Sequence, residues 1–503
     1  MIEIDGESLK IENVIKVARE GEEVVLAKKA AEKINKCREK VEKIINEGKV
    51  VYGINSGVGE LSNVRISLDE IEELQKNLVR SHACAVGEEL PEEVVRAMML
   101  LRMNSLAKGY SGVTLNLVEK LGEALNKKFH PVVPSQGSVG ASGDLAPLAH
   151  VALAFMGEGM VNYAGRKMPA MEALEESEIG PIRYKAKEGL ALINGTQMMT
   201  AIACLSVHDS FLLLKNAQIA GIMSLEALKG TDQAFREEIQ KVRPYEGQIK
   251  CAKNLWKLTR ESDIIASHKT CQKVQDAYTL RCMPQVFGAI WETLSYAKKM
   301  VEIEINSATD NPLIFNDVLS GGNFHGEPMA IVLDLMNIAI TKLGSFSERR
   351  IARLLDAHLS ELPPFLAQKP GLNSGLMILQ YVAASLVNEN KGLAYPSSVD
   401  SIPTSANKED YQSMGATSSL KSIRILENTK KIIAIEFITA SQALDFHELN
   451  PSKASQIAHS IIRKKIPMIE EDKPLYEDIS IASSMVHSGE IVYTVEEEIG
   501  ELE

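Results

Sequence analysis

A loop of small residues carries the most unusual chemical potential in the chain. The stretch GSVGASGDLAPLAH, residues 137–150, places Ala141, Ser142 and Gly143 in direct succession. Glycine has no Cβ, so the Gly143 nitrogen can approach a carbonyl that a larger residue would block. Attack of that nitrogen on the Ala141 carbonyl would close a five-membered ring. Loss of water from the ring and from Ser142 would leave an exocyclic methylidene, an electrophile that no standard side chain provides, and Asp144 could move protons during this dehydration.

Two plainer interpretations of this loop remain open beside the electrophile. The glycines could form a tight turn that opens a helix at Leu145. The spacing G-x-x-G-x-x-G also vaguely resembles a phosphate loop, but no Lys-Ser/Thr pair follows it and no strand pattern leads into it. The phosphate interpretation is therefore the weakest of the three.

The same loop resembles the signature of the aromatic amino acid ammonia-lyases, and seven further blocks resemble that family in the family's order. They are VYGINSGVGEL (51–61), LVRSHACAVGE (78–88), ALINGTQMMT (191–200), KVQDAYTLRCMPQV (273–286), SATDNPLIF (307–315), SGGNFHGEP (320–328) and PTSANKEDYQSMG (403–415). The resemblance implies that Ala141-Ser142-Gly143 cyclises by itself to a methylidene-imidazolone (MIO), with no external cofactor. It also implies a homotetramer whose active sites combine residues from three subunits.

Within the family, the sequences of these blocks most resemble those of the members that act on histidine. The implied reaction is elimination of ammonia from L-histidine to give trans-urocanate, in which an electrophile makes the amine a better leaving group and a base removes a β-proton. Tyr52 is the candidate base, and its flanking glycines Gly53, Gly57 and Gly59 would let the loop close over the substrate. Without this context, Tyr52 reads as a buried tyrosine whose hydroxyl has one partner.

Four more residues receive roles from the resemblance. Arg281 would bind the substrate carboxylate with its planar fork, although an ion pair with Asp276 is the plainer interpretation. Tyr278 precedes it by three residues and would handle amine elimination or a proton. Gln275 and Asn194 would hydrogen-bond near the carboxylate and the prosthetic group. Asn194 would polarise the imidazolone oxygen, and its plainer interpretation is a turn residue.

Phe324 corresponds to a family aromatic that lies near the substrate ring. The neighbouring His325 and Glu327 could suggest a metal pair, but two ligands at this spacing without a third are poor evidence. We therefore expect no metal in the site.

Two residues point to the substrate. His82, after Ser81, matches the histidine-specific members, and Glu409 matches an acidic residue that those members place near the imidazole. A carboxylate can accept a hydrogen bond from the ring N–H and favour the imidazolium, whereas phenylalanine would leave it buried and unpaired. The plainer interpretations are a core histidine and a solvated glutamate within the charged run KED.

Several positions carry residues that differ from those usual in the family. Lys408 stands where glutamine is usual, Ala277 where proline is usual, and Tyr411-Gln412 where His-Val is expected. Met283 likewise stands where glutamine is common. These changes leave open a related MIO enzyme that acts on tyrosine or phenylalanine, as a lyase or as a 2,3-aminomutase.

Composition excludes several classes of function. The chain has 503 residues and a formal net charge of −12, which argues against nucleic acid or an anionic membrane as the main partner. The start MIEIDGESLK has no features of a signal peptide. The apolar segment 198–228 contains His208 and Asp209, so we expect a buried helix and no membrane span. The six cysteines are Cys37, Cys84, Cys204, Cys251, Cys271 and Cys282. They are scattered and include no C-x-x-C pair, which is typical of reduced thiols in a cytoplasmic protein.

Long helices must position these residues. Apolar spacing predicts a helix that starts at Pro91 and stops at Gly109. The lack of internal proline and the scarcity of glycine predict three longer helices, over 198–230, 328–360 and 407–447. Hairpins are expected at 159–168, around Ala164-Gly165, and at 313–320, around Asn316-Asp317. The expected fold is mainly α, with an N-terminal lobe (1–195) of loops and short hairpins that carries the MIO loop and a C-terminal bundle of long helices (196–503).

Overall fold

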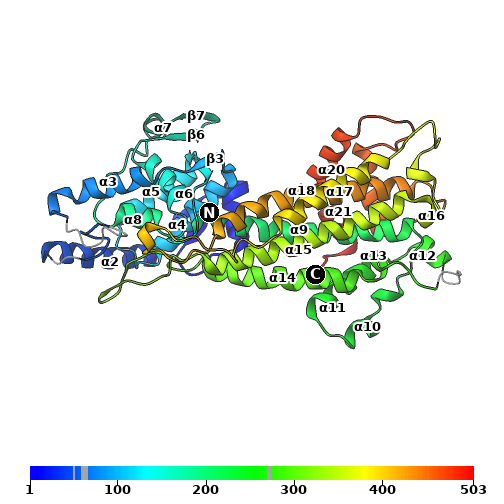
Figure 1. Cartoon of the computed structure of the whole chain (residues 1–503), viewed down its shortest axis with the longest axis horizontal. Helices are drawn as coiled ribbons and strands as arrows, with labels where there is room; N and C mark the ends of the chain where they lie inside the picture. The colour runs from blue at the N-terminus through cyan, green and yellow to red at the C-terminus, as the bar shows by residue number, and fades with distance from the viewer. Residues whose placement is uncertain (49–50, 58–65, 269–273) are drawn as a thin grey trace. The chain divides into compact units, whose positions relative to one another are not determined.

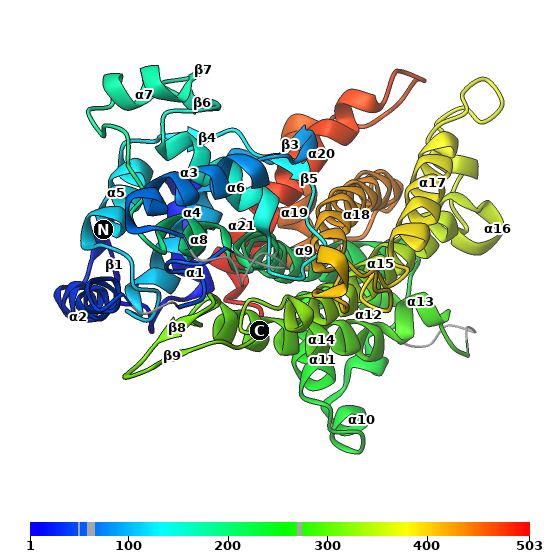
Figure 2. The same cartoon turned by 60° about the vertical axis from the view of Figure 1, so that its left-hand side comes forward.

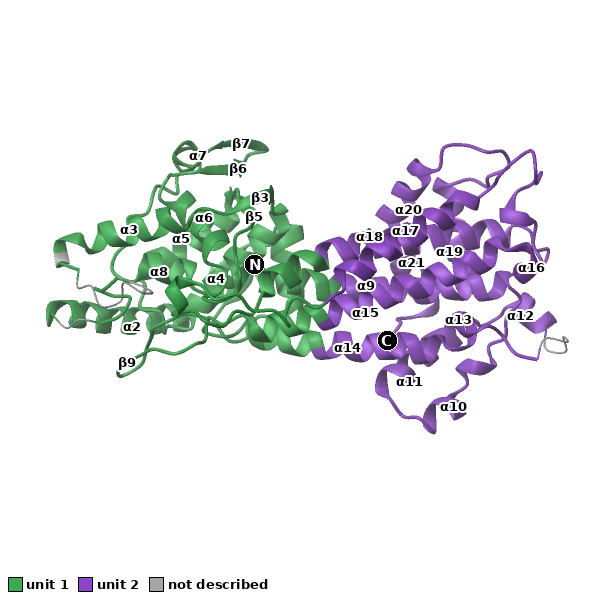
Figure 3. Cartoon of the chain, in the orientation of Figure 1, with its two compact units in different colours: residues 1–208, 297–334, 396–422 green, residues 209–296, 335–395, 423–503 purple. Residues whose placement is uncertain are grey.

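The computed structural model describes the whole chain except residues 49–50, 58–65 and 269–273. Gly59 and Cys271 therefore lie outside the described residues. The chain divides into two compact units (Figure 3). Unit 1 comprises residues 1–208, 297–334 and 396–422, and unit 2 comprises residues 209–296, 335–395 and 423–503. Four long helices contribute residues to both units: α9 (Gln197–Ala227), α14 (Met283–Glu304), α15 (Glu327–Leu355) and α18 (Gly415–Leu444).

Unit 1 is built mostly from helices of moderate length (Figure 1). They are α1 (Ile11–Ile15), α2 (Lys28–Asn46), α3 (Ile71–His82), α4 (Glu92–Ala107), α5 (Leu115–Asn126), α6 (Leu145–Phe155), α7 (Ala170–Glu176) and α8 (Glu188–Ile193), with the π-helical turn η1 (Lys16–Glu20) and the 3-10 turns η3 (Leu68–Glu70) and η6 (Ser405–Asn407).

The strands of unit 1 form small ribbons. β1 (Ile2–Ile4) pairs in parallel with β2 (Val24–Leu26), and β3 (Val86–Glu89) pairs antiparallel with β5 (Pro134–Gln136). β4 (His130–Pro131) extends the hairpin of β6 (Met160–Tyr163) and β7 (Arg166–Pro169), and β8 (Leu313–Ile314) pairs with β9 (Val318–Leu319). Both hairpins predicted from sequence are confirmed, at the turns where Ala164-Gly165 and Asn316-Asp317 stand.

Helix α4 is the central helix of unit 1, because residues 94–107 are all buried. It is surrounded by other elements of the unit, since it contacts α1, α2, α5 and β4. Its buried polar side chains pair with carbonyls at the ends of other segments: Arg96 donates to Val17 O (2.7 Å) and Arg102 donates to Asn194 O (2.8 Å). Such pairing satisfies groups that would be costly to bury alone. Pro91 is the N-cap residue, one position before the helix.

Three helices of unit 1 contact one another, namely α3, α6 and α8 (Figure 2). Helix α3 ends at His82, α6 begins directly after Asp144, and α8 ends directly before Asn194. Contacts among these helices therefore bring predicted site residues to one region.

Unit 2 is a helical bundle. Besides its parts of the four long helices it contains α10 (Glu237–Lys241), α11 (Glu246–Leu258), α12 (Asp263–Ser267), α13 (Tyr278–Arg281), α16 (Ala357–Ser360), α17 (Met377–Leu393), α19 (Lys453–Lys465), α20 (Tyr476–Ser488), α21 (Glu490–Ile499) and the turns η4 (Gln233–Phe235) and η5 (Pro364–Leu366). Glu436 of α18 joins three helices, since it accepts from Ser224 Oγ of α9 (2.8 Å) and from Arg350 Nη2 of α15 (2.8 Å). Both members of the Arg350–Glu436 ion pair are fully buried, where each charge requires its partner.

Helices α9 and α15 are long and apolar enough to cross a membrane by length and composition. However, 83% and 67% of their most apolar windows are buried inside the molecule. The prediction that 198–228 forms a buried core helix is confirmed.

One predicted helix begins later than its pattern indicates. The segment 407–447 was expected to be helical throughout, but α18 starts at Gly415. Asn407 and Met414 have left-handed φ values of 65° and 54°, which a right-handed helix cannot contain. The segment before α18 is therefore a loop, and it carries Glu409.

Candidate active site

The Ala-Ser-Gly loop of unit 1 is held against a second glycine turn. Gly143 has a left-handed φ of 73° and forms a β-bridge with Gly195, and the Asp144 N–H donates to Gly195 O at 2.7 Å. A Cβ on Gly143 would lie 2.1 Å from Gly195 O. Both the angle and the contact require glycine at this position. The predicted helix start is also confirmed, because α6 begins at Leu145.

Asn194 contributes its amide to this loop. It follows the last residue of α8 in an extended conformation, and its Nδ2 donates to the Ser142 carbonyl oxygen at 3.0 Å. Its own carbonyl accepts from Arg102, as described above. The side-chain donor is thus aimed at the oxygen of the central residue of the tripeptide, where it can stabilise negative charge.

Asp144 lies fully buried beside the tripeptide. Its Oδ2 accepts from the backbone N–H groups of Met198 (2.9 Å) and Met199 (3.0 Å) in the first turn of α9, and Oδ1 accepts from Ser138 Oγ (3.1 Å). Burial raises the pKa of this carboxyl from 3.8 to about 7, although the backbone and hydroxyl donors lower it. The group can therefore take up or release a proton near neutral pH.

A cavity of about 710 Å³ in unit 1 brings together six of the predicted site residues. They reach it from six separate segments and are Tyr52, His82, Ser142, Asn194, Phe324 and Glu409. Ala141 and Gly143 flank Ser142 and are both buried. Apolar side chains complete one part of the wall, namely Leu74, Leu78, Leu145 and Leu190. The arrangement can hold a small molecule with one ring and several polar groups.

The orientation of the His82 ring follows from its contact. Its Nδ1 lies 2.8 Å from Leu78 O. A carbonyl oxygen only accepts, so Nδ1 carries the hydrogen and Nε2 of the neutral ring is an acceptor.

Glu409 reaches the cavity from a tightly turned loop. Thr404 Oγ1 donates to Glu409 Oε2 at 3.2 Å, and the two residues form an antiparallel bridge. Between them, Ser405, Ala406 and Asn407 all have left-handed φ values, of 51°, 51° and 65°. Lys408 lines the cavity beside Glu409, so a cation and an anion both border it.

Gln275, Tyr278 and Arg281 do not line this cavity. They belong to unit 2, where 70% of Tyr278 is exposed and the Arg281 guanidinium lies 4.8 Å from the centre of its ring. Within the residues that the structure describes, no ion pair joins Arg281 to Asp276; Asp276 accepts from the Thr231 N–H at 2.8 Å.

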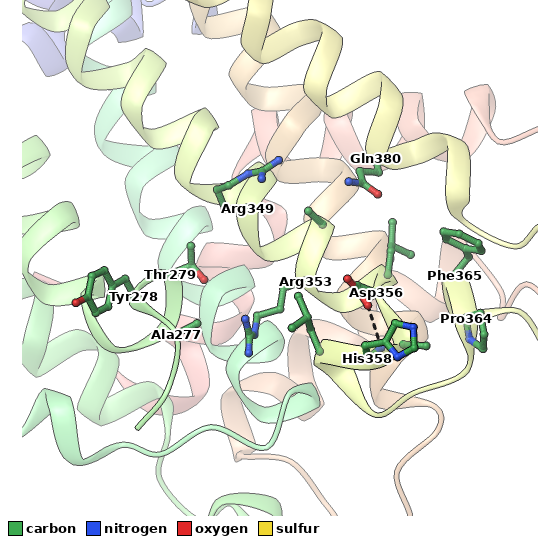
Figure 4. Close-up of a pocket in the computed structure, with 14 residues that line it drawn as sticks. Ala277, Tyr278, Thr279, Arg349, Arg353, Asp356, His358, Pro364, Phe365 and Gln380 are labelled. Carbon is green, nitrogen blue, oxygen red and sulfur yellow. Dashed lines mark hydrogen bonds between the residues drawn. The ribbon is translucent and has the colours of Figure 1, made fainter. Parts of the chain in front are cut away.

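Tyr278 lines a second cavity, of about 680 Å³, in unit 2. Arg349, Arg353 and His358 also line it, and Figure 4 shows the Asp356 carboxylate that accepts from the His358 N–H at 2.9 Å.

No cluster of three or more His, Cys, Asp or Glu side chains that could hold a metal occurs in the described part of the chain. His325 and Glu327 are joined through the backbone, since the Glu327 N–H donates to His325 Nδ1 at 3.3 Å.

Residues 9–464 match the model of the family described as "Aromatic amino acid lyase". The chain belongs to the aromatic amino acid lyase family. The resemblance in the sequence blocks is thereby confirmed, and this is a family that uses MIO.

Three similar proteins span nearly the full length of the chain. The chain is 51% identical to the histidine ammonia-lyase of Caldanaerobacter subterraneus subsp. tengcongensis over 98% of each protein. The crystal structure of tyrosine aminomutase from Streptomyces globisporus matches with a TM-score of 0.95 at 37% identity, over 100% of both chains. The crystal structure of histidine ammonia-lyase from Trypanosoma cruzi matches with a TM-score of 0.92 at 40% identity, over 99% of this chain and 95% of that one. The prediction of a mainly α fold is confirmed.

Sequence reasoning missed the residues that support Glu409. The family resemblance gives Thr404 no role, and Gln412 differs only in replacing the second residue of the usual His-Val pair. That departure was the one available signal.

Proposed function

We propose that this chain is an ammonia-lyase that eliminates ammonia from L-histidine and forms trans-urocanate. The observation that carries the proposal is the single cavity in which Glu409 and His82 stand together with Ser142 and Asn194. A carboxylate acceptor suits a substrate ring that has an N–H to donate, and it would be costly to bury opposite an apolar ring. The name of the Caldanaerobacter relative agrees with this substrate.

The loop fits the prosthetic group that the family uses. Gly143 has no Cβ to obstruct a close approach to its nitrogen, and the Asn194 amide is directed at the Ser142 carbonyl. When formed from Ala141, Ser142 and Gly143 with loss of two waters, the MIO supplies an electrophile for the substrate amine. Asp144, whose pKa lies near neutrality, exchanges the protons of that dehydration.

Side chains of the same cavity hold the substrate and move its proton. Tyr52, from the loop after α2, would act as the base in its phenolate form and take the β-proton on its phenolic oxygen. Phe324 packs against the substrate ring, and Glu409 accepts from the ring N–H. His82 presents Nε2 as an acceptor.

Other copies of the chain supply the missing carboxylate site. Gln275, Tyr278 and Arg281 lie outside the unit 1 cavity, and Tyr278 is largely exposed. We propose a homotetramer with shared active sites, in which Arg281 binds the substrate carboxylate in bidentate fashion and Gln275 and Tyr278 complete the site. The enzyme needs no external cofactor, binds neither nucleic acid nor membrane, and works in the cytoplasm.

A second candidate is a related enzyme that acts on tyrosine or phenylalanine, as a lyase or a 2,3-aminomutase. The match to tyrosine aminomutase favours it, and so does Lys408, whose ammonium borders the cavity next to Glu409.

Parallel assays separate these candidates. L-histidine, L-tyrosine and L-phenylalanine are incubated with the purified protein, and ultraviolet absorbance reports a conjugated acid while chromatography detects a β-amino acid. The first candidate requires urocanate from L-histidine as the fastest product. A faster β-tyrosine or cinnamate-type product would establish the second candidate. Mass spectrometry of the peptide that contains residues 137–150 tests for the loss of two waters.

A further inference from the structure

Gln412 is a buried amide next to the loop that carries Glu409. Only 1% of this residue is exposed. Its Nε2 donates to Thr404 Oγ1 at 3.0 Å and to the Glu409 carbonyl oxygen at 2.7 Å. An amide nitrogen has two hydrogens, so both are used in these bonds.

These two bonds determine the direction of the next one. Thr404 Oγ1 accepts from Gln412, and its single hydrogen therefore points to Glu409 Oε2, 3.2 Å away. A flipped amide would set Gln412 Oε1 against the Glu409 carbonyl, where two acceptors would face each other. The chain of donors runs from amide to hydroxyl to carboxylate, and it ends on a side chain that lines the cavity.

The backbone around this chain of donors needs such support. The left-handed residues Ser405, Ala406 and Asn407 are each less stable than in an ordinary conformation and persist only where other contacts hold them. The Thr404 N–H donates to Glu409 O at 2.9 Å, and the Gln412 N–H donates to Ser401 Oγ at 2.8 Å. Gln412 thus bonds to residues on both sides of the left-handed stretch, and it fixes the Thr404 hydroxyl directly before that stretch.

We propose that Gln412 is a positioning residue which, through the Thr404 hydroxyl, holds the Glu409 carboxylate for a substrate ring that donates an N–H. This inference rests on the proposed histidine activity and deepens it. One carboxylate oxygen is occupied by Thr404, so the other is held ready for the substrate. Gln412 and Thr404 thereby determine substrate selectivity without touching the substrate.

The test compares substitutions that remove single donors. Gln412→Met removes both amide hydrogens at similar volume, Thr404→Val removes the hydroxyl, and Thr404→Ser keeps it. We expect the first two to raise KM for L-histidine about tenfold, equivalent to about 1.4 kcal/mol of binding. The kcat should change much less, and Thr404→Ser should restore KM to near the wild-type value. The double variant should be no worse than either single one, because both act on one hydrogen bond.

Gln442→Met is the matched control. Gln442 is also 1% exposed, and its Nε2 also donates two hydrogen bonds, in this case to the carbonyl oxygens of Leu366 and Ile469 in unit 2. The Gln442→Met substitution removes a buried amide of the same kind without touching the Glu409 loop. The KM of this variant for L-histidine should therefore equal that of the wild type.

The outcomes separate two failures. If the wild-type protein turns over L-histidine and Gln412→Met raises KM no more than Gln442→Met does, the positioning role is wrong while the proposed function stands. If the wild type does not turn over L-histidine, both the proposed function and the positioning role are wrong. Should Gln412→Met fail to fold, the Thr404→Val and Thr404→Ser pair decides: equal KM values in these two variants would overturn the proposal.

Discussion

Gly143→Ala is the sharpest test of how the tripeptide is held. A Cβ at this position would lie 2.1 Å from Gly195 O, whereas real Cβ atoms essentially never approach closer than 3.0 Å, so the two turns must separate by about 0.9 Å. The left-handed φ of 73° adds about 1–2 kcal/mol for a residue with a Cβ. Separation also breaks the bond from the Asp144 N–H to Gly195 O, worth about 1 kcal/mol.

The expected loss is therefore about 2–3 kcal/mol in the free energy of unfolding. A displacement of about 1 Å at the reacting atoms should also lower turnover by about 10²-fold or more. Urea unfolding followed by circular dichroism measures the first effect, and urocanate absorbance measures the second.

Gly165→Ala is the control, since Gly165 has almost the same φ, 75°, but nothing lies within 4 Å of its Cβ position. This variant should lose only the conformational part, about 1–2 kcal/mol, and keep its turnover. Equal losses of stability and turnover in the two variants would refute the close-approach explanation.

Three further substitutions test the remaining chemistry. Ser142→Ala should remove nearly all turnover with an unchanged circular dichroism spectrum, and near-wild-type rates would exclude a dehydrated Ser142. Glu409→Gln should lower kcat/KM for L-histidine more than for any aromatic side substrate, and an equal loss on all substrates would contradict a contact with the imidazole. Asp144→Asn tests the carboxyl whose pKa is raised from 3.8 to about 7 in the folded state. The folded protein binds the extra proton, so this group's contribution to stability is complete below pH 3.8 and is lost as pH rises through about 7. Urea unfolding at several pH values should then show the variant gaining stability relative to the wild type from pH 5 to pH 8; parallel pH curves would contradict the raised pKa.

Local sequence signals predicted the elements that depend on local chemistry. Ala164-Gly165 marks a hairpin because its turn needs left-handed residues, and the structure has φ values of 49° and 75° there. The start of α18 was predicted eight residues too early because no proline separates the loop from the helix and Gly415 is the only glycine between Asn407 and His447. The conformation of that loop depends on hydrogen bonds between side chains and backbone, which no periodicity encodes.

The candidate site shows the same division. Motifs predicted Ser142, Asn194, His82 and Glu409, and the structure gathers all four around one cavity. The donors behind Glu409 could not be predicted, because Thr404 and Gln412 meet only after the chain between them has folded back. A sequence pattern relates residues that are close along the chain, and it does not indicate where the chain folds back to bring distant residues into contact.

The segment from Thr404 to Gln412 is tied together by its own hydrogen bonds, while the Gly143–Gly195 bridge holds the loop that carries Ser142. On the proposed roles, the residues that select the substrate and the tripeptide that reacts with it therefore lie on separate segments. Transplanting the whole nine-residue segment between relatives should therefore transfer the substrate preference. Replacing Glu409 alone would transfer the carboxylate without the hydrogen bonds that hold it.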